Sequence, residues 1–290
     1  MRETELELEP LDRTFGAIVG GVDLKHLDDS TWQSLHDAWL EYALLIFPRQ
    51  FLTQAEQNAF ALRFGDLEFE AAPISNIDSQ GRVHSEPDDD RVKSLKGNEG
   101  WHHDSTYMPV QAKGAVFTAE IVPSEGGNTG WADMRAAYEA LDAETRTLTE
   151  DLAAYHSLAH SQGRAGYLPS RRTEKGGYVG YGYHDGEPPL RPLVKVHPET
   201  GSPNLVIGRH AYGVVGMDPD ESERLLDRLA NEACQPPRTY YHHWEVGDAV
   251  VWDNRRLMHQ ATLYDMTQPR RMWHARIAGD RPSELALNYT

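Results

Sequence analysis

The stretch from Glu99 to Tyr107 constrains the fold of this chain more than any other part of the sequence. Within it, His102 and Asp104 stand two residues apart, so in an extended segment both side chains leave the same face of the backbone. One imidazole and one carboxylate on one face are two of the three protein ligands in the 2-His-1-carboxylate sites of non-haem Fe(II) oxygenases. The third ligand must come from far along the chain, and the segment 250–259 can supply it through His259. The fold must then close two distant segments around one metal.

This spacing alone does not decide the question, because a chain with 14 histidines and 45 acidic residues also contains such pairs by chance. Two further residues support the metal site. Thr129 lies in a glycine-bounded turn that can present its hydroxyl, and Arg270 follows His259 at a spacing that suits a strand, a turn and a returning strand. That geometry would place the guanidinium near the metal. Arginine binds carboxylates through two parallel hydrogen bonds, so the pattern favours capture of an organic acid.

The composition narrows the class of protein and of partner. A net charge of −17 argues against nucleic acid or an anionic membrane surface as a partner. Cys234 is the single cysteine, which excludes an intrachain disulfide and fits a reducing compartment. The first residues lack the apolar region of a signal peptide, and no apolar run is long enough for a membrane span. We therefore expect a cytoplasmic protein.

The periodicity of apolar residues predicts many short strands with helices mainly in the first half. Helices are expected at about 31–43, from a capping box at Thr53 to near Gly65, from Asp133 to about 141, in a short segment opened by Asp142, and at 220–232. Strands are expected at 15–23, 44–47, 115–121, 193–197, 204–208, 239–245, 248–252, 258–263 and 271–278. The segments at about 69–100 and 161–191 look irregular and are expected to form lid-like loops.

These elements predict one domain over residues 1–290, mainly β with flanking helices and similar to a jelly roll. A parallel βαβ fold is disfavoured because strands and helices do not alternate regularly along the chain. No internal repeat, linker or low-complexity segment divides the sequence.

The sequence also resembles a known family. The pattern W-H-x-D, then Thr129, then W-D-N-R-x-x-x-H-x10-R is similar to the taurine dioxygenase and 2,4-dichlorophenoxyacetate dioxygenase family of Fe(II)/2-oxoglutarate oxygenases. Further segments resemble the branch of aryloxyalkanoate dioxygenases that act on (S)-2-aryloxypropionates. These segments are 101–109, 114–117, 132–138, 191–201, 208–210 and 250–255. The resemblance covers nearly the whole chain.

The resemblance implies a double-stranded β-helix, the cupin-like form of the jelly roll. It implies that His102, Asp104 and His259 bind Fe(II), and that Thr129 and Arg270 hold the distal carboxylate of 2-oxoglutarate. O2 would be the second co-substrate. Halogenation is not expected, because related halogenases lack the carboxylate that Asp104 supplies.

The sequence departs from the family at the residue that grips the substrate anion. The family's arginine at this place lies four residues past the oxoglutarate arginine, and here that position is His274, with Arg276 two residues further on. This departure makes taurine itself a poor substrate candidate and leaves the anion's partner open. The residues considered for substrate contact are Asn98, His103, Tyr107, His210, Tyr212, His274 and Arg276.

The hypothesis is therefore a dioxygenase that hydroxylates a small anionic substrate, with a 2-aryloxypropionate as the first choice. The products would be a phenol and a 2-oxo acid, with succinate and CO2. The same chemistry on a sulfonate, an alkyl sulfate, an amino-acid-like compound or a natural-product intermediate is the main alternative. A non-catalytic metal- or oxoglutarate-binding jelly roll and a protein-modifying oxygenase are further alternatives. Whether the chain forms a homo-oligomer is left open.

Overall fold

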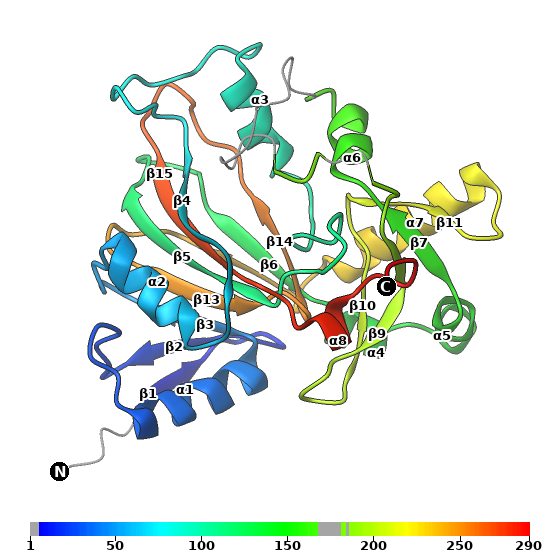
Figure 1. The fold of residues 1–290 in the computed structure, drawn as a ribbon, viewed down its shortest axis with the longest axis horizontal. Helices are drawn as coiled ribbons and strands as arrows, with labels where there is room; N and C mark the ends of the chain where they lie inside the picture. The colour runs from blue at the N-terminus through cyan, green and yellow to red at the C-terminus, as the bar shows by residue number, and fades with distance from the viewer. Residues whose placement is uncertain (1–5, 168–180, 184–185) are drawn as a thin grey trace.

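The larger of two main β-sheets is built from strands that lie far apart in the sequence (Figure 1). The structure, a computed structural model, describes residues 6–167, 181–183 and 186–290. The larger sheet has seven strands in the order β1-β2-β3-β13-β5-β15-β4. In that order their bounds are Glu7–Pro10, Ala17–Gly20, Leu44–Phe47, Ala249–Asp253, Gly114–Ile121, Arg271–Ile277 and Leu67–Ser75. Neighbouring strands are antiparallel except β2 and β3, which are parallel.

The smaller main sheet has the order β12-β6-β14. Its strands are Thr239–His242, Thr129–Asp133 and Leu257–Ala261. Two minor sheets, β11-β7-β8 and β10-β9, lie towards the other end of the molecule, near α7 (Figure 1). Their strands are Ala211–Val214, Ala153–His156, Leu190–Pro192, Pro203–Leu205 and Val194–Val196. The predicted jelly roll with helical flanks is confirmed.

The central strands are apolar throughout because both faces of the larger sheet are covered. Side chains alternate between faces along a strand, so on β13 Ala249 and Val251 point to one side while Val250 and Trp252 point to the other. The first pair joins a core with Trp39 of the first long helix. The second pair joins a core that also contains residues of the smaller sheet. The inner core therefore lies between the two sheets, where the site is built.

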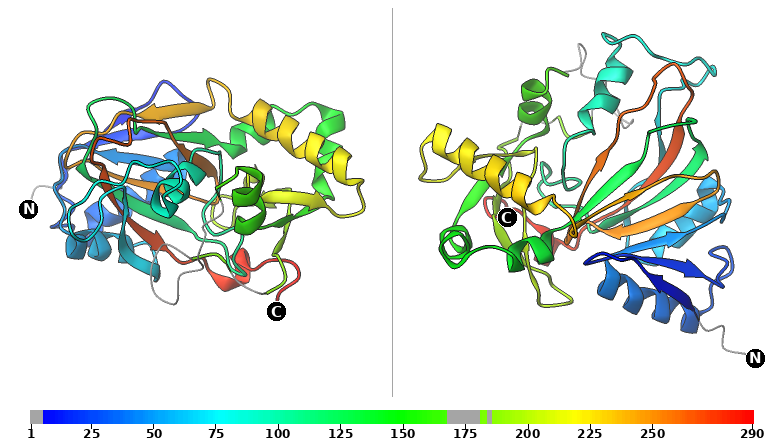
Figure 2. Two further views of the ribbon diagram at one scale, coloured as in Figure 1. Left: turned by 90° about the horizontal axis from the view of Figure 1, so that it is seen from above. Right: turned by 180° about the vertical axis from the view of Figure 1, so that it is seen from behind.

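Apart from α8, the helices of the described residues begin after a side chain that caps the first turn. Their bounds are α1 Asp29–Tyr42, α2 Gln54–Leu62, α3 Asp90–Gly97, α4 Met134–Glu139, α5 Ala143–Glu150, α6 Leu158–Arg164, α7 Pro219–Ala233 and α8 Arg281–Glu284. The predicted capping box is confirmed: the Thr53 hydroxyl accepts from the Glu56 amide, and Glu56 accepts from the Thr53 amide. The cap of α1 is Asp28, whose side chain accepts from the Thr31 amide. Helices α1 and α2 cover the outer face of the larger sheet, and α7 lies at the far end (Figure 2).

The expectation of an irregular loop at 69–100 is wrong at both ends of the segment. Strand β4 continues to Ser75 and pairs with β15 at the edge of the sheet. Helix α3 begins after Asp89, whose carboxylate accepts from the Arg91 amide. The acidic stretch 86–90 thus supplies a helix cap. The second expected loop, 161–191, includes the end of α6, and residues 168–180 and 184–185 lie outside the described residues.

Among the residues that the structure describes, no helix combines the length and the apolar content needed to cross a membrane.

Replacing the capping threonine tests the origin of α2. The variant Thr53→Ala removes the acceptor for the Glu56 amide and should lower the free energy of unfolding by about 1 kcal/mol. Urea unfolding followed by circular dichroism measures this change. The control is Thr147→Ala, whose hydroxyl bonds only to the Ala143 carbonyl on an exposed helix face and should change stability by less than about 0.5 kcal/mol. Equal stability of the two variants would contradict the capping role.

Candidate active site

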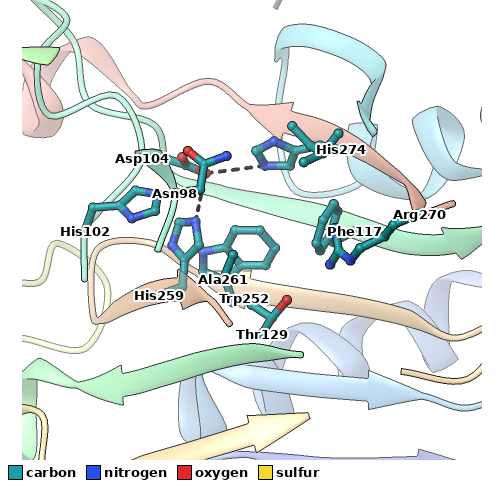
Figure 3. A pocket seen from close by; sticks show the side chains of 11 residues that line it. Asn98, His102, Asp104, Phe117, Thr129, Trp252, His259, Ala261, Arg270 and His274 are labelled. Carbon is teal, nitrogen blue, oxygen red and sulfur yellow. Dashed lines mark ion pairs between the residues drawn. The ribbon is translucent and has the colours of Figure 1, made fainter. Parts of the chain in front are cut away.

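A cavity opens between the two main sheets, beside the inner core (Figure 3). Its volume is about 50 Å³. The residues that line it are Ile74, Asn98, His102, Asp104, Phe117, Thr129, Trp252, His259, Ala261, Arg270 and His274. The residues singled out from the sequence as metal ligands and carboxylate anchors therefore share one cavity.

The two histidines meet through their backbones. The His102 amide donates to the His259 carbonyl at 2.9 Å, and the His259 amide donates to the His102 carbonyl at 2.8 Å. This antiparallel bridge adds the 99–107 stretch to the smaller sheet beside β14. It brings nitrogen atoms of His102 and His259 and a carboxylate oxygen of Asp104 within 4.8 Å of one another, an arrangement that could hold a metal ion.

Both imidazoles are prepared to act as ligands. Nδ1 of His102 donates to the Gly100 carbonyl at 2.7 Å, which leaves the lone pair of Nε2 free. Burial lowers the pKa of His102 to about 4 and holds the pKa of His259 well below its ordinary value. Both rings are therefore neutral near pH 7, as metal binding requires.

The carboxylate of Asp104 presents one oxygen to the cavity. Its Oδ1 accepts from Nη2 of Arg276 at 2.7 Å. Its Oδ2 is buried without a hydrogen-bond partner, although His274 Nε2 lies 3.3 Å away and His259 Nε2 lies 3.8 Å away. Burial by itself would raise the pKa of Asp104, but the Arg276 guanidinium holds it well below its ordinary value. A buried, charged and unbonded oxygen beside two neutral imidazoles fits a divalent metal ion.

The backbone of Asp104 is fixed by a side chain that follows β13. The amide of Asn254 bridges the Asp104 peptide: its Oδ1 accepts from the Asp104 amide at 2.7 Å, and its Nδ2 donates to the Asp104 carbonyl at 3.0 Å. Nδ2 also donates to the Ala112 carbonyl at 2.8 Å. This contact gives the W-D-N-R segment a structural role at the carboxylate, in addition to bracing the turn before His259.

Arg270 and Thr129 lie at the other end of the cavity (Figure 3). Nε and Nη2 of Arg270 donate to the Gly127 carbonyl, and no carboxylate of the described residues forms an ion pair with this guanidinium. Burial lowers the pKa of Arg270 to about 10, so it stays charged at neutral pH. The Thr129 hydroxyl accepts from Trp244 Nε1 at 3.0 Å, which leaves its hydrogen to donate.

The strand expected to return after His259 and to bring Arg270 near the metal is β15, which begins one residue after Arg270. It belongs to the larger sheet, whereas β14, which contains His259, belongs to the smaller one.

Of the seven residues considered for substrate contact, the structure places Asn98 and His274 on the cavity wall and the other five away from it. His103 points to the opposite face of its segment from His102, and its Nδ1 donates to the Asn254 carbonyl. Tyr212 stacks on His160 at 4.2 Å in a different hollow. We therefore drop His103 and Tyr212 as substrate residues.

His210, Tyr107 and Arg276 lie behind the cavity wall. The His210 ring is 5.4 Å from the His102 ring and 4.9 Å from the Tyr107 ring, and its Nδ1 shares a hydrogen bond with Ser161. Arg276 is 1% exposed and is bound to Asp104. Because its guanidinium is already paired with a carboxylate, we do not retain Arg276 among the candidates for binding the substrate anion.

Sequence reasoning missed the apolar wall of the cavity and the ionic support of Asp104. The wall includes Ile74, Phe117 and Ala261, and His274 stacks on Trp252 with ring centroids 5.7 Å apart. The two-residue alternation along the expected strands could have placed Phe117, His274 and Arg276 on the inner face. Nothing in the sequence indicated that Arg276 meets Asp104.

Comparisons with known proteins agree with the geometry. Residues 7–276 match the family described as taurine catabolism dioxygenase TauD, TfdA family. The chain is 61% identical to the (S)-phenoxypropionate/alpha-ketoglutarate-dioxygenase of Sphingobium herbicidovorans, with 97% of this chain and 98% of that protein covered. It is 51% identical to a protein of the same name from Delftia acidovorans, over 98% and 99% of the two chains. The crystal structure of AAD-2 in complex with Mn(II) and N-oxalylglycine has a TM-score of 0.87 at 36% identity, covering 96% of this chain and 98% of that one.

A jelly roll that encloses two neutral imidazoles and one carboxylate defines a non-haem iron oxygenase scaffold. The chain belongs to the TauD, TfdA family, and it is an Fe(II)- and 2-oxoglutarate-dependent dioxygenase. The family resemblance predicted from the sequence is confirmed.

The buried neutral histidines predict how the metal-free protein responds to acid. Burial lowers the pKa of His102 and of His103 to about 4, below the ordinary value of 6.5. Below pH 6.5 the unfolded chain therefore binds protons that the folded chain does not bind until about pH 4, so the free energy of unfolding falls as the pH falls. From pH 7 to pH 5 the expected loss is about 1–2 kcal/mol for each histidine.

Urea unfolding of chelator-treated protein at these two pH values measures the loss. Asp253, whose pKa is lowered through its contact with Arg255 despite burial, contributes to the pH dependence only below about pH 3.8, outside this window. The control His243→Gln removes an exposed histidine and should leave the difference unchanged. Equal stability of the wild type at both pH values would contradict the neutral state of the buried rings.

Proposed function

We propose that His102, Asp104 and His259 bind the Fe(II) ion of this dioxygenase. The observation that carries the proposal is the buried Oδ2 of Asp104, which is charged, has no hydrogen-bond partner and lies beside two neutral imidazoles. Three protein ligands leave the remaining positions of an octahedral ion to co-substrates. When bound, the iron would supply the activation of O2 that is coupled to oxidative decarboxylation of 2-oxoglutarate.

Arg270 and Thr129 would hold the distal carboxylate of 2-oxoglutarate. Arg270 is a buried cation without an acidic partner among the described residues, and Thr129 has a hydroxyl hydrogen to donate. A carboxylate placed between them would receive charge-assisted hydrogen bonds in a site from which water is largely excluded. The cavity extends from these two residues to the metal ligands, so the keto acid end would point towards the metal.

The substrate we propose is a 2-aryloxypropionate. The support is the identity of 61% and 51% to two proteins named (S)-phenoxypropionate/alpha-ketoglutarate-dioxygenase. Hydroxylation would replace the hydrogen on the carbon that bears the ether oxygen. One oxygen atom of O2 would enter the substrate and the other would enter succinate. The hydroxylated carbon would then release a phenol and become the keto carbon of a 2-oxo acid.

The protein's part in this reaction is to position the reactants and to exclude water. Ile74, Phe117 and Trp252 supply an apolar wall, while Asn98, which matches a family position near the substrate, supplies a polar side chain. Asn98 and His274 are therefore the substrate-contact residues that we retain.

We also propose that the chain acts as one domain in the cytoplasm, on free small molecules. A net charge of −17 and a single cysteine support this setting. Neither feature favours nucleic acid or a membrane surface as a partner.

The test is anaerobic loading with Fe(II) and 2-oxoglutarate, followed by a panel of substrates. We expect a weak visible charge-transfer band from the chelate, because 2-oxoglutarate would bind the iron directly. Addition of (S)-aryloxypropionates should shift the band, and air should then release phenol. Taurine, alkyl sulfates and the (R)-enantiomers serve as the comparison set.

The His102→Ala variant is the negative control and should show no band. A band that no aryloxypropionate shifts would overturn the substrate assignment but keep the metal site. An unchanged band in His102→Ala would overturn the ligand assignment itself.

A further inference from the structure

The two oxygens of Asp104 are in different situations, and Arg276 causes the difference. Oδ1 is bonded to Nη2 of Arg276 at 2.7 Å, whereas Oδ2 makes no well-directed hydrogen bond and lies 3.3 Å from His274 Nε2 and 3.8 Å from His259 Nε2. A free carboxylate can bind a metal through one oxygen or through both. Here the guanidinium occupies one of the two oxygens before any metal arrives.

Polar contacts with Ser105 and Glu68 hold the guanidinium of Arg276 in place. Its Nη1 donates to the Ser105 hydroxyl at 3.1 Å, and that hydroxyl donates to Oε2 of Glu68 at 2.8 Å. Nε of Arg276 lies 4.0 Å from the same Glu68 oxygen. The hydroxyl of Tyr181 donates to the other oxygen of Glu68. The carboxylate of Glu68 thus supports the guanidinium through direct charge and through the Ser105 hydroxyl, and it also holds the Tyr181 hydroxyl.

Two aromatic rings, which contact each other edge to face, pack against the guanidinium. The Cζ atom of Arg276 lies 4.7 Å from the ring centre of Phe69 and 5.5 Å from that of Tyr181. Contact with two aromatic rings restricts rotation of the planar cation, and such cation–π contacts favour arginine over lysine. Because Arg276 is also 1% exposed, it cannot turn towards a substrate without breaking this packing.

The position on β15 explains why the arginine reaches Asp104. Met272, His274 and Arg276 alternate along the strand and are all buried on its inner face. The pairing between β15 and β4 shifts register between His274 and Arg276, so Phe69 lies opposite Arg276. His274 therefore lines the cavity, while Arg276 passes behind Asp104.

We propose that Arg276 is a positioning residue that keeps Asp104 a one-oxygen metal ligand, with Glu68, Ser105 and Tyr181 holding the guanidinium in place. The inference rests on the proposed metal role of Asp104. Its functional consequence is that the second carboxylate oxygen cannot take a coordination position that 2-oxoglutarate needs.

The experiment compares Arg276→Lys and Arg276→Met with the wild type, using Co(II) in place of iron. Co(II) titration followed by visible spectroscopy reports the ligand set, and calorimetry then measures 2-oxoglutarate binding to the Co(II) protein. In Arg276→Met we expect one Co(II) still to bind, the visible spectrum to change, and 2-oxoglutarate affinity to fall about 10–100-fold. Arg276→Lys keeps the positive charge but loses the planar guanidinium, with its several hydrogen-bond donors and its contacts with the aromatic rings. Its visible spectrum and its 2-oxoglutarate affinity should therefore lie between those of the wild type and of Arg276→Met.

The matched control is Arg271→Met on the same strand. Arg271 points to the outer side, where it pairs with Glu120, and this substitution should change neither the spectrum nor the 2-oxoglutarate affinity. A purely structural role of Arg276 would lower the unfolding midpoint while leaving the spectrum and the affinity of the loaded protein unchanged.

The inference would be overturned if folded Arg276→Lys had a lower unfolding midpoint but an unchanged Co(II) spectrum and 2-oxoglutarate affinity. This test does not require Arg276→Met to fold. Failure of the wild type to bind Co(II) would instead overturn the proposed metal site on which the inference rests. The two failures are therefore distinguishable.

Discussion

The site depends on one short antiparallel contact, the pair of backbone hydrogen bonds between His102 and His259. Neither residue has a local reason to approach the other, since they belong to distant parts of the sequence. The contact is possible because β14 pairs with β6 on one side and offers its other side to the 99–107 stretch. The Asn254 side chain then forms hydrogen bonds with the amide and the carbonyl of Asp104, which fixes the backbone of this residue next to the end of β13. Because these bonds involve backbone groups, they fix the ligand directions before any metal binds.

Charge balance explains how a strongly acidic protein can bind small anions. The net charge of −17 creates an unfavourable field for an anion at long range. Inside the cavity the balance is different, because Asp104 is offset by Arg276 and the ligand histidines are neutral. Arg270 remains as a buried cation without a carboxylate partner among the described residues. A divalent metal would add further positive charge, so the local potential favours 2-oxoglutarate and an anionic substrate.

Much of this site could be predicted from the sequence, because its key residues follow simple rules. The two-residue spacing of His102 and Asp104 fixed their common face, and the jelly roll followed from many short strands with few helices. The cap at Thr53 was also visible as a local pattern. The edge strand β4 was missed because its side chains are mostly half-buried and show no clear alternation. The helix α3 was missed because it begins in an acidic stretch that shows no apolar periodicity. Short elements such as β1, β7, β11 and α8 have too few residues to show a period.

The role of Arg276 could not be predicted, because it depends on a contact between strands that only the tertiary fold creates. The sequence suggested an anchor for a substrate anion, whereas the structure pairs the guanidinium with Asp104. His103 and Tyr212 were misjudged for a related reason. Their neighbours in sequence line the cavity or lie close behind it, but alternation turns His103 away, and Tyr212 packs on His160 elsewhere.

The most direct measurement is the stoichiometry and affinity of metal binding in Asp104→Asn compared with the wild type. Equilibrium dialysis of anaerobic protein against Mn(II) or Fe(II) gives both quantities. The wild type should bind one ion per chain. Asp104→Asn keeps the shape of the side chain but removes its charge, and it should bind the ion far more weakly. One ion bound with equal affinity by both proteins would show that the metal does not lie between His102, Asp104 and His259.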